Sequence, residues 1–120
     1  YDLRFEDDRC DPKTGVTIAH SFVSEKRVRF VTGFGCSGVT LAAASVYNKH
    51  SVPMMVLAAS SPKISGLHPA IFRTHPSDGE AARVLADHIQ STGTTRLGIL
   101  SAEAEYSKDF LDAFSSQYKG

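Results

Sequence analysis

The stretch VPMMVLAA, residues 52–59, constrains the fold more than any other part of the sequence, because every residue in it is nonpolar. A strand with one face in water alternates polar and nonpolar residues, whereas a strand covered on both faces is nonpolar throughout. This pattern is typical of a central strand in a parallel sheet. We therefore expect a sheet that carries helices on both of its faces.

Strand and helix patterns alternate on either side of this stretch. Further strands are expected at residues 1–7, 29–34 and 96–100, and a long irregular connection at residues 60–76. Helices are expected from Pro12 to Lys26, over residues 39–50, from Ser77 to Gln90, and from Ser107 to about Tyr118. Asp11 before Pro12 and the capping box S-x-x-E at residues 77–80 mark two of the starts. This order predicts a single α/β domain with a three-layer α/β/α parallel sheet.

Each expected helix has a nonpolar face at helical spacing, which predicts the side chains that it buries. The predicted core residues are Val16, Ala19, Phe22 and Val23 in the first helix, Val39, Ala42, Ala43 and Val46 in the second, Ala81, Leu85 and Ile89 in the third, and Phe110, Leu111 and Phe114 in the last.

The composition argues against several classes of protein. Thirteen basic residues balance thirteen acidic ones, so the sequence lacks the excess positive charge of a nucleic-acid binder. No nonpolar run approaches the roughly 20 residues of a membrane span, and the first residues are charged where a signal peptide is nonpolar. We expect a soluble chain whose export signal, if it has one, is removed or lies outside this sequence.

The two cysteines, Cys10 and Cys36, each follow an expected strand. Both positions could lie at one edge of the sheet, where a disulfide is geometrically possible and would indicate an oxidising compartment. Two unrelated buried thiols remain the alternative at this point.

The stretch GFGCSG, residues 33–38, matches the glycine pattern G-x-G-x-x-G of dinucleotide sites. Such a site also needs an acidic residue after the next strand, but that strand ends in LAASSP. Cys36 could act as a nucleophile only beside a positioned base, and no motif provides one. A phosphoacceptor domain would need an aspartate where Ala58, Ala59 and Ser60 stand. We therefore expect neither a cofactor nor a metal, and no catalytic residue.

A binding site without catalysis fits the remaining residues better. Ligands of open parallel sheets bind at the carboxyl ends of the strands. Ser37 at a helix N-cap offers a hydroxyl and free backbone N–H groups to a carboxylate. Ser60 and the carbonyl of Ala58 offer acceptors to an ammonium group. The alternative is that Ser37 only caps its helix and Ser60 is only a loop residue.

The sequence resembles the branched-chain (Leu/Ile/Val) amino acid binding proteins, which are type I periplasmic binding proteins of ABC importers. The resemblance rests on four segments in order: EDDRCDPKTGVTIAHSFV, VRFVTGFGCSGVTLAAASVYNKHSVPMMVLAASSP, IFRTHPSDGEAARVLADHI and RLGILSAEAEYSKDFLDAF. It implies a disulfide between Cys10 and Cys36 and a flavodoxin-like lobe.

The resemblance also implies a role for each residue of the ligand site. Ser37 matches the serine that holds the ligand carboxylate, while Ala58 and Ser60 match the carbonyl and hydroxyl that hold the α-amino group. Tyr106 matches a tyrosine near the cleft. Gly38 and Ala59 complete the expected ligand-binding set, although Gly38 stands where close relatives carry a further hydroxyl.

Members of the family are about three times as long, with two lobes that close over the ligand. The resemblance implies that residues 1–120 form a partial N-terminal lobe that lacks the opening strand, so the strand at Leu3 has no in-sheet neighbour. It implies capture of an amino acid or similar carboxylate in the periplasm for an ABC permease, and a possible homodimer by strand exchange. A ligand-sensing lobe of a receptor or regulator is the alternative, followed by a small flavodoxin-like enzyme or cofactor binder.

Overall fold

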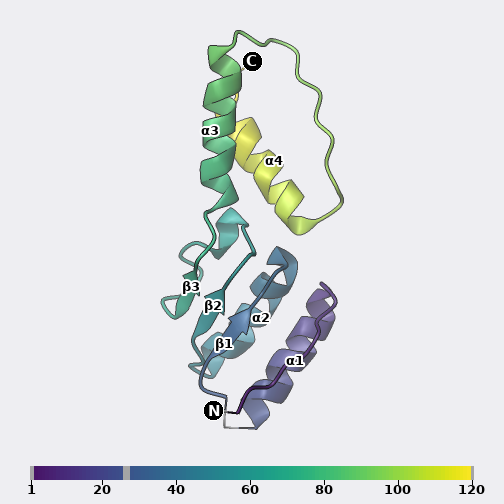
Figure 1. Cartoon of the computed structure of the whole chain (residues 1–120), viewed down its shortest axis with the longest axis vertical. Helices are drawn as coiled ribbons and strands as arrows, with labels where there is room; N and C mark the ends of the chain where they lie inside the picture. The colour runs from purple at the N-terminus through teal and green to yellow at the C-terminus, as the bar shows by residue number, and fades with distance from the viewer. Residues whose placement is uncertain (1, 26–27, 120) are drawn as a thin grey trace.

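The computed structural model describes residues 2–25 and 28–119 (Figure 1). The molecule is elongated, with extents of 56 × 25 × 23 Å. One end contains α1, α2 and a parallel sheet, and the other contains the paired helices α3 and α4 (Figure 1). We call residues 10–74 the sheet body and residues 77–118 the helical hairpin.

Helix α1, Pro12–Ser24, begins where the sequence predicts. The Asp11 side chain caps it by accepting hydrogen bonds from the backbone N–H of Thr14 (2.8 Å) and from its hydroxyl (2.7 Å). These bonds lower the pKa of Asp11. The helix ends before the expected Lys26, which lies outside the described residues. Ala19 is fully buried against α2, and the predicted face of α1 is confirmed.

The sheet has three parallel strands in the order β1-β2-β3: Val31–Gly33, Met54–Val56 and Ile71–Arg73. Helix α2, Ser37–Lys49, connects β1 to β2. The expected strands at 29–34 and 52–59 are therefore present but shorter. Strand β3 lies inside the expected irregular connection, which also contains the short 3-10 helix η1, Pro62–Ile64.

One face of this sheet carries the main core. Met54 and Val31 pack with Ala43 and Tyr47 of α2, and α1 packs against α2 in turn. Side chains that alternate onto the other face, such as Thr32 and Phe72, are exposed. The parallel α/β architecture is confirmed. The expected third layer, a set of helices on the second face of the sheet, does not cover Thr32 or Phe72.

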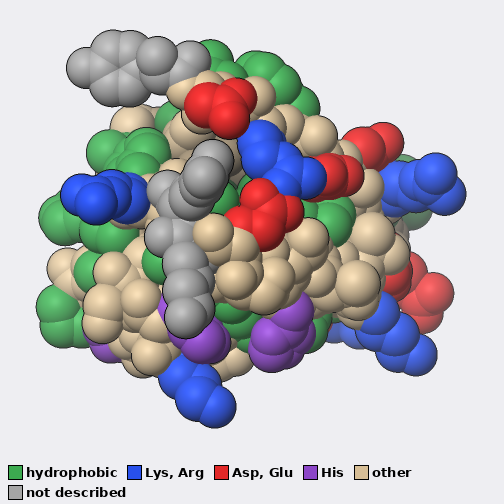
Figure 2. Space-filling view, turned by 90° about the horizontal axis from the view of Figure 1, so that it is seen from below, with side chains coloured by type: hydrophobic (Ala, Val, Ile, Leu, Met, Phe, Trp, Pro, Cys, Tyr) green, Lys and Arg blue, Asp and Glu red, His purple; other side chains and the backbone are tan. Residues whose placement is uncertain are grey.

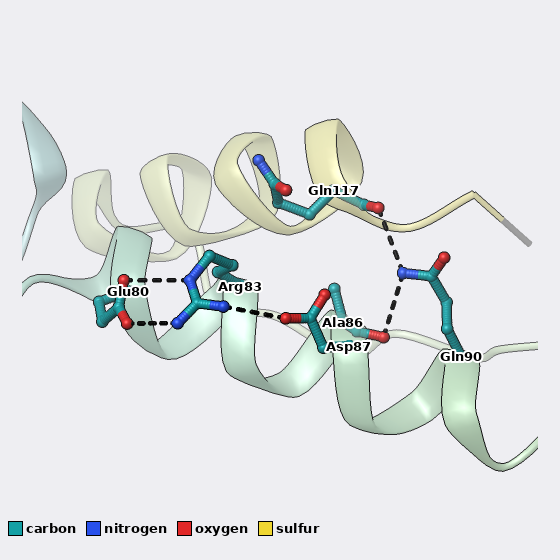
Figure 3. Close-up of polar contacts among 6 residues, drawn as sticks. All are labelled: Glu80, Arg83, Ala86, Asp87, Gln90 and Gln117. Carbon is teal, nitrogen blue, oxygen red and sulfur yellow. Dashed lines mark hydrogen bonds and ion pairs between the residues drawn. The ribbon is translucent and has the colours of Figure 1, made fainter.

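The helical hairpin joins α3, Asp78–Ser91, to α4, Glu105–Gln117. Its buried residues are Ala82, Ala86 and Phe114, with Ile89 and Phe110 packed partly against them. The predicted α3 face was wrong in part, because Ala81 and Leu85 are exposed. The face shifts by one position because α4 packs closely against the small Ala82 and Ala86. Gln90 Nε2 also donates to the carbonyls of Ala86 and Gln117, both at 3.3 Å (Figure 3).

Two expected strands do not form. Residues 2–8 and 94–100 are extended without ladder partners, and Leu3, Phe5 and Leu100 are exposed. A strand needs a neighbour to satisfy its backbone groups, and neither segment lies beside one. Ser77 caps α3 as predicted, whereas α4 begins two residues before the expected Ser107, which is buried in its first turn.

On the face that Figure 2 shows, charges of opposite sign lie beside each other rather than in separate patches. Figure 2, which views the end with the sheet, shows acidic and basic side chains grouped together among exposed nonpolar ones. Arg4, for example, forms an ion pair with Glu25 and lies over the Phe22 ring at 5.8 Å. No helix within residues 2–25 or 28–119 combines the length and the apolar character needed to cross a bilayer.

Candidate functional site

The candidate site lies at the carboxyl ends of the strands, where the chain leaves β1 and β2. The N–H of Leu57 donates to the Gly33 carbonyl at 2.8 Å, and the N–H of Ala59 donates to the Phe34 carbonyl at 3.0 Å. These bonds keep the two strand ends together beyond the sheet itself. The start of α2 and the loop at residues 57–61 are therefore neighbours, as parallel strand order predicts.

The disulfide fixes the start of α2. Cys10 and Cys36 are bonded, with a Cα–Cα distance of 5.6 Å, which confirms the pairing that the resemblance implied. Cys36 is the N-cap residue of α2 and makes no side-chain capping bond. The prediction that Ser37 is the N-cap was wrong by one position, since Ser37 is the first helical residue. The disulfide thus ties the N-terminus of α2 to the turn before α1.

Ser37 is buried, with 4% of its surface exposed, and its hydroxyl has a partner within the chain. Ser37 Oγ accepts a hydrogen bond from the backbone N–H of Ser61 at 3.2 Å. Gly38 beside it faces Pro12 and Glu105, because an added Cβ would lie at contact distance from both, 3.4 Å from Pro12 Cγ and 3.8 Å from Glu105 Cβ. The first turn of α4 therefore lies close to the first turn of α2.

The loop after β2 holds the other candidate residues. Ser60 Oγ donates to Asp78 Oδ2 at 2.6 Å, and the Asp78 N–H donates back to the Ser60 carbonyl at 2.9 Å. Ala58 is exposed, whereas Ala59 is buried. Tyr106 is half exposed in the first turn of α4. The structure thus brings Ser37, Gly38, Ser60 and the start of α4 into one region.

A polar cluster that sequence reasoning missed covers this region. Asp109 on α4 is buried, with 3% of its surface exposed. Its Oδ2 accepts from the hydroxyl of the fully buried Ser61, and its Oδ1 lies 2.6 Å from Lys63 Nζ. Lys63 also contacts Glu105 Oε1 at 3.0 Å. Its hydrogen bond to Asp109, and then the one to Glu105, raise the pKa of the Lys63 ammonium.

Arg73 at the end of β3 was also missed. Its Nη1 donates to the carbonyls of Ser61 at 2.9 Å and Ser60 at 3.3 Å, and its Nη2 donates to Ser65 Oγ at 2.7 Å. The guanidinium therefore fixes the loop that carries the candidate hydroxyls. Arg73 ends the nonpolar start of the segment IFRTHP, and this was its one signal in the sequence. The strand formed by that segment was not predicted.

Two shallow nonpolar hollows lie elsewhere, on the helical hairpin. One runs along the outer side of α3, from Pro76 to His88, and the other lies between α3, α4 and the extended segment near Leu97. Neither is lined by Ser37 or Ser60. The described part of the chain contains no group of three or more His, Cys, Asp and Glu side chains placed to hold a metal ion.

Residues 1–119 match the family model described as periplasmic binding protein. The chain belongs to this family. It is 31% identical, over 117 residues, to the Leu/Ile/Val-binding protein homolog 3 of Brucella melitensis, and this match covers 95% of the chain and 31% of that relative. The chain thus spans about a third of the length of the curated relatives it matches.

Solved structures agree with this membership. An ABC transporter substrate-binding protein from Desulfitobacterium hafniense in complex with Leu is 29% identical, with a TM-score of 0.78 over 97% of this chain and 35% of that one. A solute binding protein of Rhodopseudomonas palustris BisB5 in complex with 3,4-dihydroxybenzoic acid shares the fold at 24% identity, with a TM-score of 0.86 over 98% and 32%. The resemblance to the branched-chain group of type I periplasmic binding proteins is confirmed.

Proposed function

We propose that this chain provides part of the binding site of an ABC importer's substrate-binding component, and that this site takes a free amino acid or a related small carboxylate without catalysis. The observation that carries the proposal is the meeting of Ser37, at the N-terminus of α2, with the loop of Ser60 and Ser61 at the end of β2. Unbonded N–H groups at a helix start favour a carboxylate. Ser60 and the exposed Ala58 lie on the side where an ammonium group would be bound.

The relatives support the ligand class. The Brucella melitensis relative is named for the binding of leucine, isoleucine and valine, and the similar structure from Desulfitobacterium hafniense is in complex with Leu. On the same basis we propose that the chain acts with an ABC permease outside the cytoplasm. The Cys10–Cys36 disulfide supports such a location, because disulfides persist in oxidising compartments.

The test is a titration of the chain with Leu, Ile and Val, in which the amide NMR signals of Gly38 and Ser60 report binding. We expect weak binding, with a dissociation constant on the order of millimolar, because a ligand held on one side forms only part of its contacts. Ser37→Ala should weaken it further, whereas Ser91→Ala at the far end of α3 should not. Submicromolar binding, or shifts confined to the hairpin hollows, would contradict the proposal.

We further propose that two copies of the chain can associate by strand exchange. Strand β1 is at the edge of the described sheet, and Leu3 and Phe5 in the segment before α1 are exposed and have no ladder partners. An unpaired strand edge is a template for pairing with another chain. Light scattering should show a mass that rises with concentration, and Phe5→Lys should abolish the rise. A mass that stays monomeric at high concentration would rule the exchange out.

A further inference from the structure

The helical hairpin and the sheet body have separate nonpolar cores, and the start of α4 is joined to the sheet body largely through polar side chains. Ala82, Ala86 and Phe114 form the hairpin core, while the sheet-body clusters draw on the segments before Arg73. Ser61 and Lys63 in the loop after β2 meet Asp109 and Glu105 on α4. Contacts of this kind depend on charge and can be broken without emptying either core.

Asp109 is the residue of this cluster on which the contact between α4 and the loop after β2 most depends. Its carboxylate is buried, and its Oδ1 lies 2.6 Å from Lys63 Nζ, close enough for an ion pair. Removing the Lys63 charge leaves the buried Asp109 carboxylate without its counter-charge, which favours opening to water. The Lys63 side chain is more than half exposed, so its replacement leaves no buried cavity.

The cluster adjoins the candidate carboxylate site. The Ser61 whose hydroxyl donates to Asp109 also donates its backbone N–H to Ser37 Oγ. Glu105, the second partner of Lys63, has its Cβ beside Gly38 in the first turn of α2. Separation of α4 from the loop would therefore expose Ser61 and Ser37 together.

We propose that Lys63, Asp109 and Ser61 form an electrostatic latch that closes the start of α4 over the N-terminus of α2 and so controls access to Ser37. A ligand carboxylate reaches this helix terminus only when the Lys63–Asp109 pair has opened. The proposal rests on the proposed function in one respect, namely that the site beneath the latch binds a ligand carboxylate. The closure itself can be measured without any ligand.

The experiment measures hydrogen exchange at the Ser61 amide by NMR on the whole chain with its disulfide intact. Lys63→Met should speed this exchange roughly tenfold or more, because the buried Asp109 charge then needs water. The double variant Lys63→Met/Asp109→Asn should restore slow exchange, since the neutral amide needs no counter-charge and can still accept from the Ser61 hydroxyl. Lys63→Arg should keep it slow.

Arg83 provides the matched control, because it also joins two carboxylates. Its guanidinium contacts Glu80 at 2.6 Å and Asp87 at 3.0 Å, all on the exposed side of α3 (Figure 3). Arg83→Met therefore removes a cation from a similar cluster that spans no contact between the hairpin and the sheet body. It should leave the Ser61 amide unchanged.

Core amides of Ala19 and Val56 report in the same spectra that the sheet body stays folded. If Lys63→Met does not fold, Asp109→Ala serves instead, and the same rise is expected because Ser61 and Lys63 both lose their contact with Asp109. Failure of an amino acid to bind would affect only the proposed function. The latch is overturned if Ser61 exchange is unchanged in these variants, or if Arg83→Met raises it as much as Lys63→Met does.

Discussion

The sheet body and the helical hairpin reach their folded state by different means. The sheet body has a covalent crosslink, a hydrogen-bonded parallel sheet and buried clusters that include Met54, Val56 and Tyr47. The hairpin has two helices around Ala82, Ala86 and Phe114, and it leaves Val84 and Leu85 exposed. Because nonpolar burial provides most of the stabilising free energy, the hairpin should open at a lower free energy than the sheet body.

The largest expected effect is a loss of stability confined to the hairpin, caused by truncation of Phe114, the large buried side chain of its core. Phe114→Ala should cost about 3–5 kcal/mol of the free energy that keeps the hairpin closed, because it removes an aromatic ring from a small core. Amides of α3 and α4 should lose their protection from exchange while those of α1 and α2 keep theirs. Tyr106→Ala, on the exposed side of the same helix, is the control and should change little. Equal loss of protection in both regions would show that they unfold as one unit.

Removal of the crosslink should act in the opposite region. Replacing Cys10 and Cys36 by serine should lower the free energy of unfolding of the sheet body by about 3 to 4 kcal/mol, because the disulfide closes a loop of 26 residues in the unfolded chain. Denaturant titrations of the oxidised protein and the double variant measure the change. Amide exchange in α3 should stay as it was; a rise there equal to that in α1 would contradict the separation.

The contact between α1 and α2 should be sensitive to a single methyl group. Gly15 is buried in α1, and a Cβ added there would lie 2.5 Å from Val39 Cγ1. Gly15→Ala should therefore destabilise the sheet body by roughly 1–3 kcal/mol despite the better helix propensity of alanine. The same change in a Val39→Ala background should cost much less, and a double-mutant cycle measures the difference. Additive costs would mean that the two helices do not meet at this point.

The smallest effect concerns alkaline pH and is confined to the sheet body. Burial raises the pKa of Tyr47 from 10.0 to about 12. A phenol that ionises more readily in the unfolded state contributes stability below pH 10, and that contribution is lost as the pH rises from 10 towards 12. Thermal unfolding across this range should show a fall that Tyr47→Phe reduces. An identical fall in the variant would assign it to other groups.

Local signals in the sequence predicted much of the sheet body and the start of the helical hairpin. Asp11 and Ser77 start their helices as capping chemistry requires, and the nonpolar residues around Met54 form a buried parallel strand. The family resemblance, rather than spacing, predicted the Cys10–Cys36 bond. Ser37 and Ser60 fall into one region because parallel strands end at the same edge.

What the sequence did not predict depends on partners that are distant along the chain. The segments at Leu3 and Ile99 have the composition of strands, yet composition does not tell whether a neighbouring strand is present to pair with. Ala81 and Ala82 are equivalent in any helical pattern, so only the approach of α4 selects Ala82 for burial. Asp109 reads as a surface carboxylate in a helix, and no local signal places it beside Lys63, 46 positions earlier in the sequence.

The connection between α3 and α4 has a practical consequence. Residues 95–103 are exposed throughout and extended, which is the form in which proteases accept a peptide. A single cut there would leave a longer piece ending in α3 and a short peptide containing α4. Phe114 packed with Ala82 and Ala86, and the Tyr118 hydroxyl bonded to the Thr94 carbonyl at 2.7 Å, would remain to hold the pieces together. The chain is thus a natural candidate for reconstitution from two peptides, with the α4 peptide added or withheld at will.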